Sequence, residues 1–308
     1  MTFSRPSKFI LLAGAFFGIV LVVTIAGTLA FIIGVDSLLL WRDLRRPVEH
    51  RILFIGNSFT YQNDLDKMVG AMLDAQQEQN NDVFIARIAF GGYRLFDHLD
   101  DTFENERDSN IRAYLIDGPD QVRNWDMVIF QEQVPLQGSI AYPSEKANSV
   151  ASAIALGKFA HHSGSNIMFM QTWGYALDPN DPENVYPEFS RMQAHLANAN
   201  FDLSQALLEE DIVADIAPAG HGFLLVYQDV MKSGLNPFEE GSKFLKLYAE
   251  DRQHASQAGT YLAAAVVTAS YLDTPVSEID WVPIGLEPDF CRYLREVADR
   301  VVFGSQFP

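Results

Sequence analysis

Three side chains far apart in the sequence have the types and spacing needed for acyl transfer. Ser58 ends the segment 51–58, and Asp251 and His254 lie three positions apart near the other end of the chain. In a tight turn, a carboxylate three residues before a histidine can accept a hydrogen bond from one imidazole nitrogen. The other nitrogen can then take the proton of a serine hydroxyl. The sequence therefore predicts Ser58 as the nucleophile, His254 as the base and Asp251 as the residue that orients the base.

Acyl transfer also needs hydrogen-bond donors for the oxyanion of its intermediate. We expect these to be the backbone N–H groups of Ser58 and Gly92 and a side-chain amide of Gln131 or Gln133. Gly92 belongs to a glycine pair, where the backbone can approach a ligand closely. The two glutamines follow the apolar run 125–130 directly. A plain turn at the glycines and a surface loop at the glutamines are the alternatives.

Simpler structural roles exist for the other motifs as well. Gly-Asn-Ser can be an ordinary strand-to-helix turn, and Asp-x-x-His often only closes a turn. Asn57 and Trp173 are predicted to line a substrate pocket, with anchoring of the loop 174–188 as the alternative for Trp173. We interpret the pair His161 and His162 as a cap at a helix end rather than as a metal site.

Alternating strands and helices are predicted to bring the reactive groups to one edge of a parallel sheet. Short apolar runs indicate buried strands, and polar or glycine-rich residues follow them. In open α/β sheets, ligands bind at the carboxyl ends of the strands, where the strand order reverses. Strands are predicted at 52–55, 82–89, 125–130, 166–170 and 212–217, and helices at about 65–73, 95–99, 144–162, 189–209, 256–272 and 290–301.

A charge-free segment precedes the predicted sheet. Residues 9–35 would form a helix of about 40 Å, more than the ~30 Å hydrocarbon core of a bilayer requires. We therefore expect a membrane anchor in residues 1–35, a juxtamembrane linker at 36–50 and one domain at 51–308. A cleaved signal peptide with a small-residue site near 28–30 is the alternative.

The predicted side of the membrane for the domain at 51–308 depends on which residues are counted. Lys and Arg counts on the two sides of the segment favour a cytoplasmic domain. An amino-terminal anchor ahead of a hydrolase-like domain favours an extracytoplasmic domain, which is our expectation.

Composition narrows the classes of partner. The chain has 308 residues, with 22 Lys and Arg against 40 Asp and Glu, and its net charge of -18 argues against nucleic acid or an anionic lipid surface as the principal partner. Cys291 is the single cysteine, which excludes an internal disulfide and a cysteine-based zinc site. No oligomeric state is predicted.

Four segments resemble, in order, the sequence blocks of the SGNH (GDSL-type) hydrolase superfamily. They are Gly56–Thr60, Gly91–Gly92, Trp125–Gln133 and Asp251–His254. They most resemble a branch whose blocks read Gly-Asn-Ser-Phe-Thr, Gly-Gly, Leu-Gln-Glu-Gln and Asp-x-x-His-Pro-Ser, and the match covers roughly residues 51–272. The resemblance implies a three-layer α/β/α flavodoxin-like sandwich. It also implies hydrolysis of carboxylic esters, often acetyl groups on carbohydrates, with no metal or organic cofactor.

The chain departs from the superfamily pattern at three places. The asparagine of the third block, an oxyanion donor, is absent, so that Gln131 or Gln133 would have to replace it. Arg94 stands where a small hydroxyl residue is usual, and Ala255 replaces the usual proline after the histidine. The first two changes bear on the oxyanion hole and the substrate class.

The function predicted from these observations is that of a membrane-anchored serine esterase. Its expected partners are a small-molecule or carbohydrate ester substrate and a membrane, through the N-terminal helix, with no nucleic acid. A non-catalytic ligand-binding protein that keeps the SGNH fold is one alternative. A lipid-directed esterase or thioesterase, which would differ in acyl length, is another.

Overall fold

The computed structural model describes residues 48, 50–76, 83–104, 111–116, 125–134, 137, 142–177, 186 and 188–304. The predicted anchor at 9–35 and almost all of the linker at 36–50 lie outside these residues. Of the helices that are described, none combines the length and apolar character that crossing a bilayer requires.

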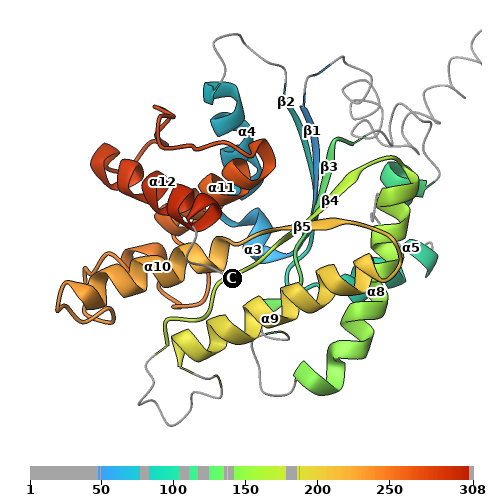
Figure 1. The fold of residues 1–308 in the computed structure, drawn as a ribbon, viewed down its shortest axis with the longest axis horizontal. Coiled ribbons are helices and arrows are strands. Elements are labelled where there is room, and N and C mark those ends of the chain that lie inside the picture. The colour runs from blue at the N-terminus through green and yellow to red at the C-terminus, as the bar shows by residue number, and fades with distance from the viewer. Residues whose placement is uncertain are drawn as a thin grey trace, which may run out of the picture. The chain divides into compact units, whose positions relative to one another are not determined.

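The described residues contain a five-stranded sheet with the order β2-β1-β3-β4-β5 (Figure 1). Every neighbouring pair is parallel. The order is that of flavodoxin-like folds, and it reverses direction beside β1, between β1 and β3. The strands are β1 (His50–Gly56), β2 (Val83–Ala89), β3 (Met127–Phe130), β4 (Asn166–Met170) and β5 (Ala214–Ala217). All five predicted strands are thus confirmed, with bounds that differ by a few residues.

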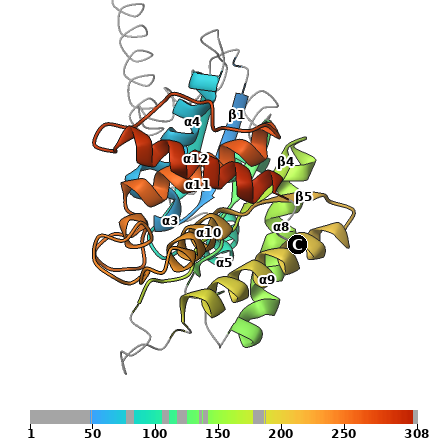
Figure 2. The same ribbon diagram turned by 60° about the vertical axis from the view of Figure 1, so that its left-hand side comes forward.

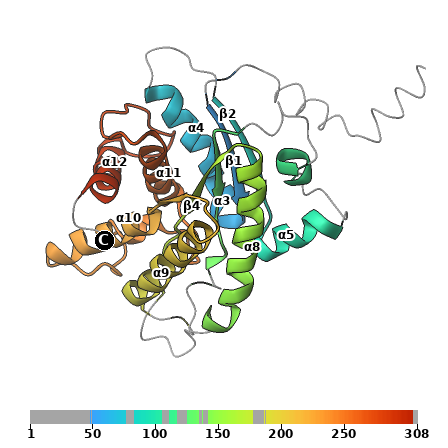
Figure 3. The same cartoon turned by 45° about the vertical axis from the view of Figure 1, so that its right-hand side comes forward.

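Helices cover both faces of the sheet, so the predicted three-layer α/β/α architecture is confirmed (Figures 1 and 3). On one face, α4 packs against α11, and α10 and α12 pack against α11 in turn (Figure 2). On the other face, α8 packs between α5 and α9. The bounds are α3 (Ser58–Tyr61), α4 (Leu65–Gln76), α5 (Leu95–Glu104), α8 (Tyr142–His162), α9 (Phe189–Leu208), α10 (Ala219–Lys232), α11 (Gln257–Leu272) and α12 (Pro288–Phe303).

The central strands are buried on both faces. The side chains of 52–55 and of 128–130 are fully inaccessible to solvent. Continuous apolar strands of this kind are typical of parallel sheets that helices cover on both sides. The carboxyl ends of β1 and β3 are therefore held rigidly, which matters for the groups that follow them.

The helix α10 was not predicted from the sequence. Gly220 and Gly222 lie near its start, and glycine is a poor helix former. Here the missing side chain is required by packing, because a Cβ on Gly220 would lie 2.0 Å from the backbone oxygen of Thr172. Gly220 therefore allows α10 to approach the residues after β4 closely, whereas a Cβ on Gly222 would lie 3.3 Å from Leu262 of α11.

Candidate active site

Ser58 stands directly beyond the carboxyl end of β1, as predicted. It is the first residue of the single-turn helix α3, and Asn57 caps that helix by accepting a hydrogen bond from the backbone N–H of Phe59. Gly56 precedes the turn at a position where a Cβ would lie 2.4 Å from the Thr60 hydroxyl. The turn therefore needs glycine, and it holds Ser58 at the edge of the sheet.

The structure brings Ser58, His254 and Asp251 together in one hydrogen-bonded chain. His254 Nε2 lies 2.9 Å from Ser58 Oγ, and His254 Nδ1 lies 2.6 Å from Asp251 Oδ2. With the proton on Nδ1, the imidazole donates to the carboxylate and accepts from the serine hydroxyl. This is the geometry in which a histidine can remove the proton of a serine nucleophile.

The turn around Asp251 stabilises the ionised carboxylate. Its Oδ1 accepts hydrogen bonds from the backbone N–H groups of Gln253 at 3.0 Å and His254 at 2.9 Å. Partial burial acts to raise the pKa of Asp251, but the hydrogen bonds from the His254 ring and from these two N–H groups outweigh it. The net result is a pKa below the ordinary value, so Asp251 is ionised at neutral pH.

Trp173 fastens this turn instead of lining a pocket, which corrects the sequence prediction. Its side chain is 1% exposed and stacks on Phe223 with 4.5 Å between ring centroids. The indole Nε1 donates to the backbone oxygen of Gln253 at 3.1 Å. The alternative, in which Trp173 is an anchor, is the one that the structure shows.

A second contact joins the segment that contains His254 to the segment that contains Ser58. The Asn63 side-chain amide donates to the backbone oxygen of Ala255 at 2.9 Å and to the Thr260 hydroxyl at 3.0 Å. Asn63 itself has a φ of 53°, which is uncommon for a residue with a side chain. The segment after Ser58 is thus held against the segment after His254.

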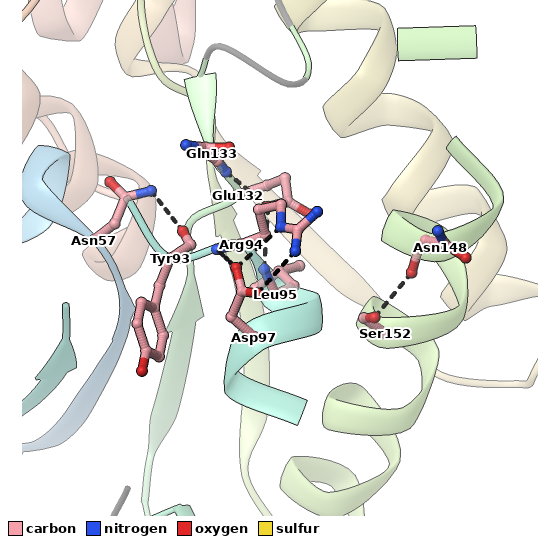
Figure 4. A network of polar contacts seen from close by, with 9 residues as sticks. All are labelled: Asn57, Tyr93, Arg94, Leu95, Asp97, Glu132, Gln133, Asn148 and Ser152. Atoms are coloured by element: carbon pink, nitrogen blue, oxygen red, sulfur yellow. Dashed lines mark hydrogen bonds and ion pairs between the residues drawn. The ribbon is translucent and has the colours of Figure 1, made fainter. Parts of the chain in front are cut away.

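Asn57 was also predicted to line the pocket, and the structure places it elsewhere. Its side chain is 1% exposed and donates from Nδ2 to the backbone oxygen of Tyr93 at 2.9 Å (Figure 4). This bond ties the turn that carries Ser58 to the loop that carries Gly92. Asn57 therefore positions two donor candidates and has almost no surface that a substrate could contact.

The two glutamines have different roles. Gln131 is 1% exposed, and its Oε1 accepts hydrogen bonds from the Asn57 backbone N–H and the Thr60 hydroxyl, both at 3.0 Å. Its Nε2 donates to the backbone oxygen of Glu132 at 2.5 Å. Gln131 is thus committed to supporting the α3 turn, which corrects its predicted place in the oxyanion hole.

Gln133 lies beside Gly92. It is half-buried, and its Nε2 lies 4.0 Å from where a Cβ on Gly92 would be. Gly92 has a φ of 74°, a conformation that favours glycine. Of the predicted side-chain donors, Gln133 is therefore the one that lies beside the glycine loop.

Glu132 was not predicted as a site residue, and it lies at the centre of this region. Its carboxyl group is almost fully buried, with 2% of the residue exposed. The carboxylate accepts hydrogen bonds from the backbone N–H groups of Leu95 and Gln133 and from the Ser149 hydroxyl. Burial raises the pKa of Glu132 above its ordinary value, although these hydrogen bonds oppose the shift. A charged residue between two glutamines at a strand end was the available signal.

Arg94, the second departure from the superfamily pattern, is paired with a carboxylate. Its guanidinium donates from Nε and Nη2 to the two oxygens of Asp97, at 3.0 Å and 2.9 Å (Figure 4). Asp97 also accepts from the Arg94 backbone N–H at 2.8 Å, at the start of α5. The Arg94 charge is therefore partly compensated within its own helical turn.

The His98 side chain forms a hydrogen bond with the end of β1. His98 was not predicted as a site residue. It is fully buried, and its Nε2 donates to the backbone oxygen of Gly56 at 2.8 Å. Burial lowers the pKa of His98, which keeps the ring neutral. Among the described residues, no group of three or more His, Cys, Asp or Glu side chains could hold a metal ion.

Comparison with known proteins identifies relatives by structure. No protein-family model matches the sequence, and no curated protein matches it. A solved structure from Slackia heliotrinireducens, described as a candidate SGNH hydrolase, is 25% identical and has a TM-score of 0.52. The match covers 72% of this chain and 98% of that one. A DUF4886 family protein from Bacteroides uniformis is 19% identical with a TM-score of 0.61, covering 84% and 97% of the two chains, and shows the same fold.

Proposed function

The chain belongs to the SGNH hydrolase superfamily and is an ester hydrolase, and we propose that Ser58, His254 and Asp251 form its catalytic triad. The observation that carries the proposal is the hydrogen-bonded chain from Ser58 Oγ through the imidazole to the Asp251 carboxylate. A serine hydroxyl is a poor nucleophile unless a base lies within reach.

In the proposed reaction, Ser58 Oγ attacks the ester carbonyl carbon while its proton moves to His254 Nε2. The carbonyl oxygen becomes an oxyanion that accepts hydrogen bonds from the Ser58 N–H, the Gly92 N–H and the Gln133 amide. Collapse breaks the bond to the alcohol, which leaves with the proton from His254. Water then attacks the acyl group in the same way, and the acid and free Ser58 are released.

The proposed substrate is a small-molecule or carbohydrate ester, with O-acetyl groups on a carbohydrate as the specific class. A lipid-directed esterase or thioesterase would use the same groups and would differ in the acyl length that it accepts. A panel of acyl donors with increasing chain length separates these substrate classes.

The rival proposal of a non-catalytic binding protein rested on the changed third block and on Arg94. Gln133 beside Gly92 supplies a donor for the missing asparagine, and Arg94 is bound by Asp97. Both observations support the enzymatic proposal. The membrane anchor at 9–35 and the extracytoplasmic side remain predictions, and accessibility of a C-terminal tag in intact cells tests them.

The test is hydrolysis of an aryl acetate by the purified full chain, beside the variants Ser58→Ala and His254→Ala. Loss of either residue should lower kcat by about 10⁴-fold or more, because nucleophile and base act as a unit. Equal rates in all three proteins would contradict the proposed triad. The Ser152→Ala variant, which changes a buried hydroxyl on α8, is the control and should keep wild-type activity.

A further inference from the structure

The buried carboxyl group of Glu132 joins three segments, namely the end of β3, the start of α5 and α8. We propose that Glu132 is a positioning residue that holds Gly92 and Gln133, the proposed oxyanion donors, at a fixed separation. The inference rests on the proposed function and adds a residue that the proposed reaction does not itself use. With 2% of the residue exposed, Glu132 has almost no surface for contact with substrate, so it acts through its neighbours.

One oxygen of the carboxylate connects the two donor segments. Glu132 Oε1 accepts from the backbone N–H of Gln133 at 2.7 Å and from the backbone N–H of Leu95 at 3.1 Å. Leu95 is the first residue of α5 and follows Gly92 by three positions. The end of β3 and the start of α5 therefore meet at a single atom (Figure 4).

The loop that contains Gly92 is held at two points. Asn57 binds the backbone oxygen of Tyr93, directly after Gly92, and Glu132 binds the backbone N–H of Leu95. The first bond sets the loop relative to Ser58, and the second sets it relative to Gln133. All three proposed donors are thereby linked through two buried side chains.

The carboxylate itself is fixed from a third side. Glu132 Oε2 accepts from the Ser149 hydroxyl on α8 at 2.6 Å, which sets the rotation of the carboxyl plane. Three donors, from the end of β3, the start of α5 and α8, thus converge on one side chain, which restricts the movement of all three segments. A buried carboxylate is costly unless it is hydrogen-bonded in this way. The arrangement therefore favours a single geometry of the donor segments.

Variants of Glu132 and of two α8 serines test this role with an aryl acetate and the full chain. Glu132→Ala should lower kcat by about 10 to 100-fold while KM changes by less than about 3-fold, because donor placement matters most in the transition state. Glu132→Gln should lose less, since an amide oxygen can still accept from both N–H groups.

Ser149→Ala should lower kcat by about 5-fold, as expected for one lost hydrogen bond. Ser152→Ala is the matched control: Ser152 is also buried on α8, but its hydroxyl binds the backbone oxygen of Asn148 at 2.8 Å (Figure 4). It should retain wild-type kcat. In every Glu132 variant the acid limb of the pH profile of kcat should stay in place, because His254 and Asp251 are untouched.

The possible outcomes separate this inference from the proposed function. A folded Glu132→Ala variant with wild-type kcat and KM, or equal kcat values for Ser149→Ala and Ser152→Ala, would overturn the positioning role alone. So would a fall in activity that follows melting temperature in all variants. If Glu132→Ala does not fold, the serine pair and Glu132→Gln still decide. Hydrolysis that survives Ser58→Ala would overturn the proposed function, and the inference with it.

Discussion

The two sides of Ser58 are built in different ways. On the base side, Asp251 and His254 lie in one turn, and the bonds between them span three residues. On the oxyanion side, the proposed donors follow the ends of β1, β2 and β3, and the buried side chains of Asn57 and Glu132 join these segments to one another. The base side is thus a local motif, whereas the oxyanion side exists only when the sheet has formed.

This difference explains which part of the site can be predicted from the sequence. The chemical role of a local motif can be inferred from the spacing of its residues in the sequence. In a site assembled from distant segments, the role of a side chain depends on its partner. A side chain that hydrogen-bonds to a neighbouring segment is no longer available to bind substrate. Gln131 and Gln133 differ in this respect, and substitutions on both sides of Ser58 test the comparison.

The largest effect should follow from Asp251→Ala. Loss of the carboxylate removes the hydrogen bond that orients His254 and fixes its tautomer, so kcat should fall by about 10³ to 10⁴-fold. Steady-state kinetics with an aryl acetate measure this, and circular dichroism checks the fold. A fall of less than 10-fold would mean that the base side needs no orienting group.

A second prediction separates the two glutamines. Gln133→Ala should lower kcat by about 100-fold or more with little change in melting temperature, because it removes one oxyanion donor. Gln131→Ala should destabilise the protein by about 1–3 kcal/mol, because the Asn57 N–H and the Thr60 hydroxyl lose their buried acceptor. The reverse pattern in kinetics and thermal unfolding would exchange their roles.

A third, smaller effect is expected from Trp173→Phe. Phenylalanine keeps an aromatic ring against Phe223 but cannot donate to the Gln253 backbone oxygen. Loosening of the base-side turn should lower kcat by about 3 to 10-fold. Unchanged kcat with a lowered melting temperature would mean that Trp173 contributes to core packing and not to the position of the base-side turn.

The smallest effect concerns stability at low pH. The pKa of Asp251 is lowered in the folded protein, so its hydrogen bonds contribute stability above the ordinary value of 3.8 and lose it as pH falls through the folded pKa. The difference in melting temperature between wild type and Asp251→Asn should therefore be larger at pH 6 than at pH 3. The side chain is half exposed, so solvent screening keeps the difference small. A difference that grows on acidification would contradict the sign.

Much of the fold could be predicted because periodicity and strand-end residues are local signals. The five strands, the parallel sheet and most helices follow from apolar runs and helical spacing. The helix α10 was missed because Gly220 and Gly222 lower helix propensity, and the close approach to Thr172 that requires a glycine at position 220 is a tertiary property.

In the site, too, local sequence signals could be predicted and contacts between distant segments could not. The proximity of Ser58, Asp251 and His254 could be predicted from sequence spacing. The positions of Gly92 and Gln133, the proposed donors, at strand ends could be predicted as well. Asn57 and Trp173 were predicted to line a substrate pocket, and Gln131 was one of two candidate oxyanion donors, because the sequence shows a polar or aromatic residue but not its partner. Each has a partner in a segment distant in the chain, and Glu132 has two such partners, Leu95 and Ser149, besides the N–H of Gln133.

The most direct test of the central claim is covalent labelling by a fluorophosphonate, read by mass spectrometry of the digested protein. The account predicts one adduct, on the peptide containing Ser58, with a rate that falls by about 1,000-fold or more in His254→Ala because the hydroxyl loses its base. Labelling at another residue, or labelling of Ser58 at the same rate without the imidazole, would contradict it.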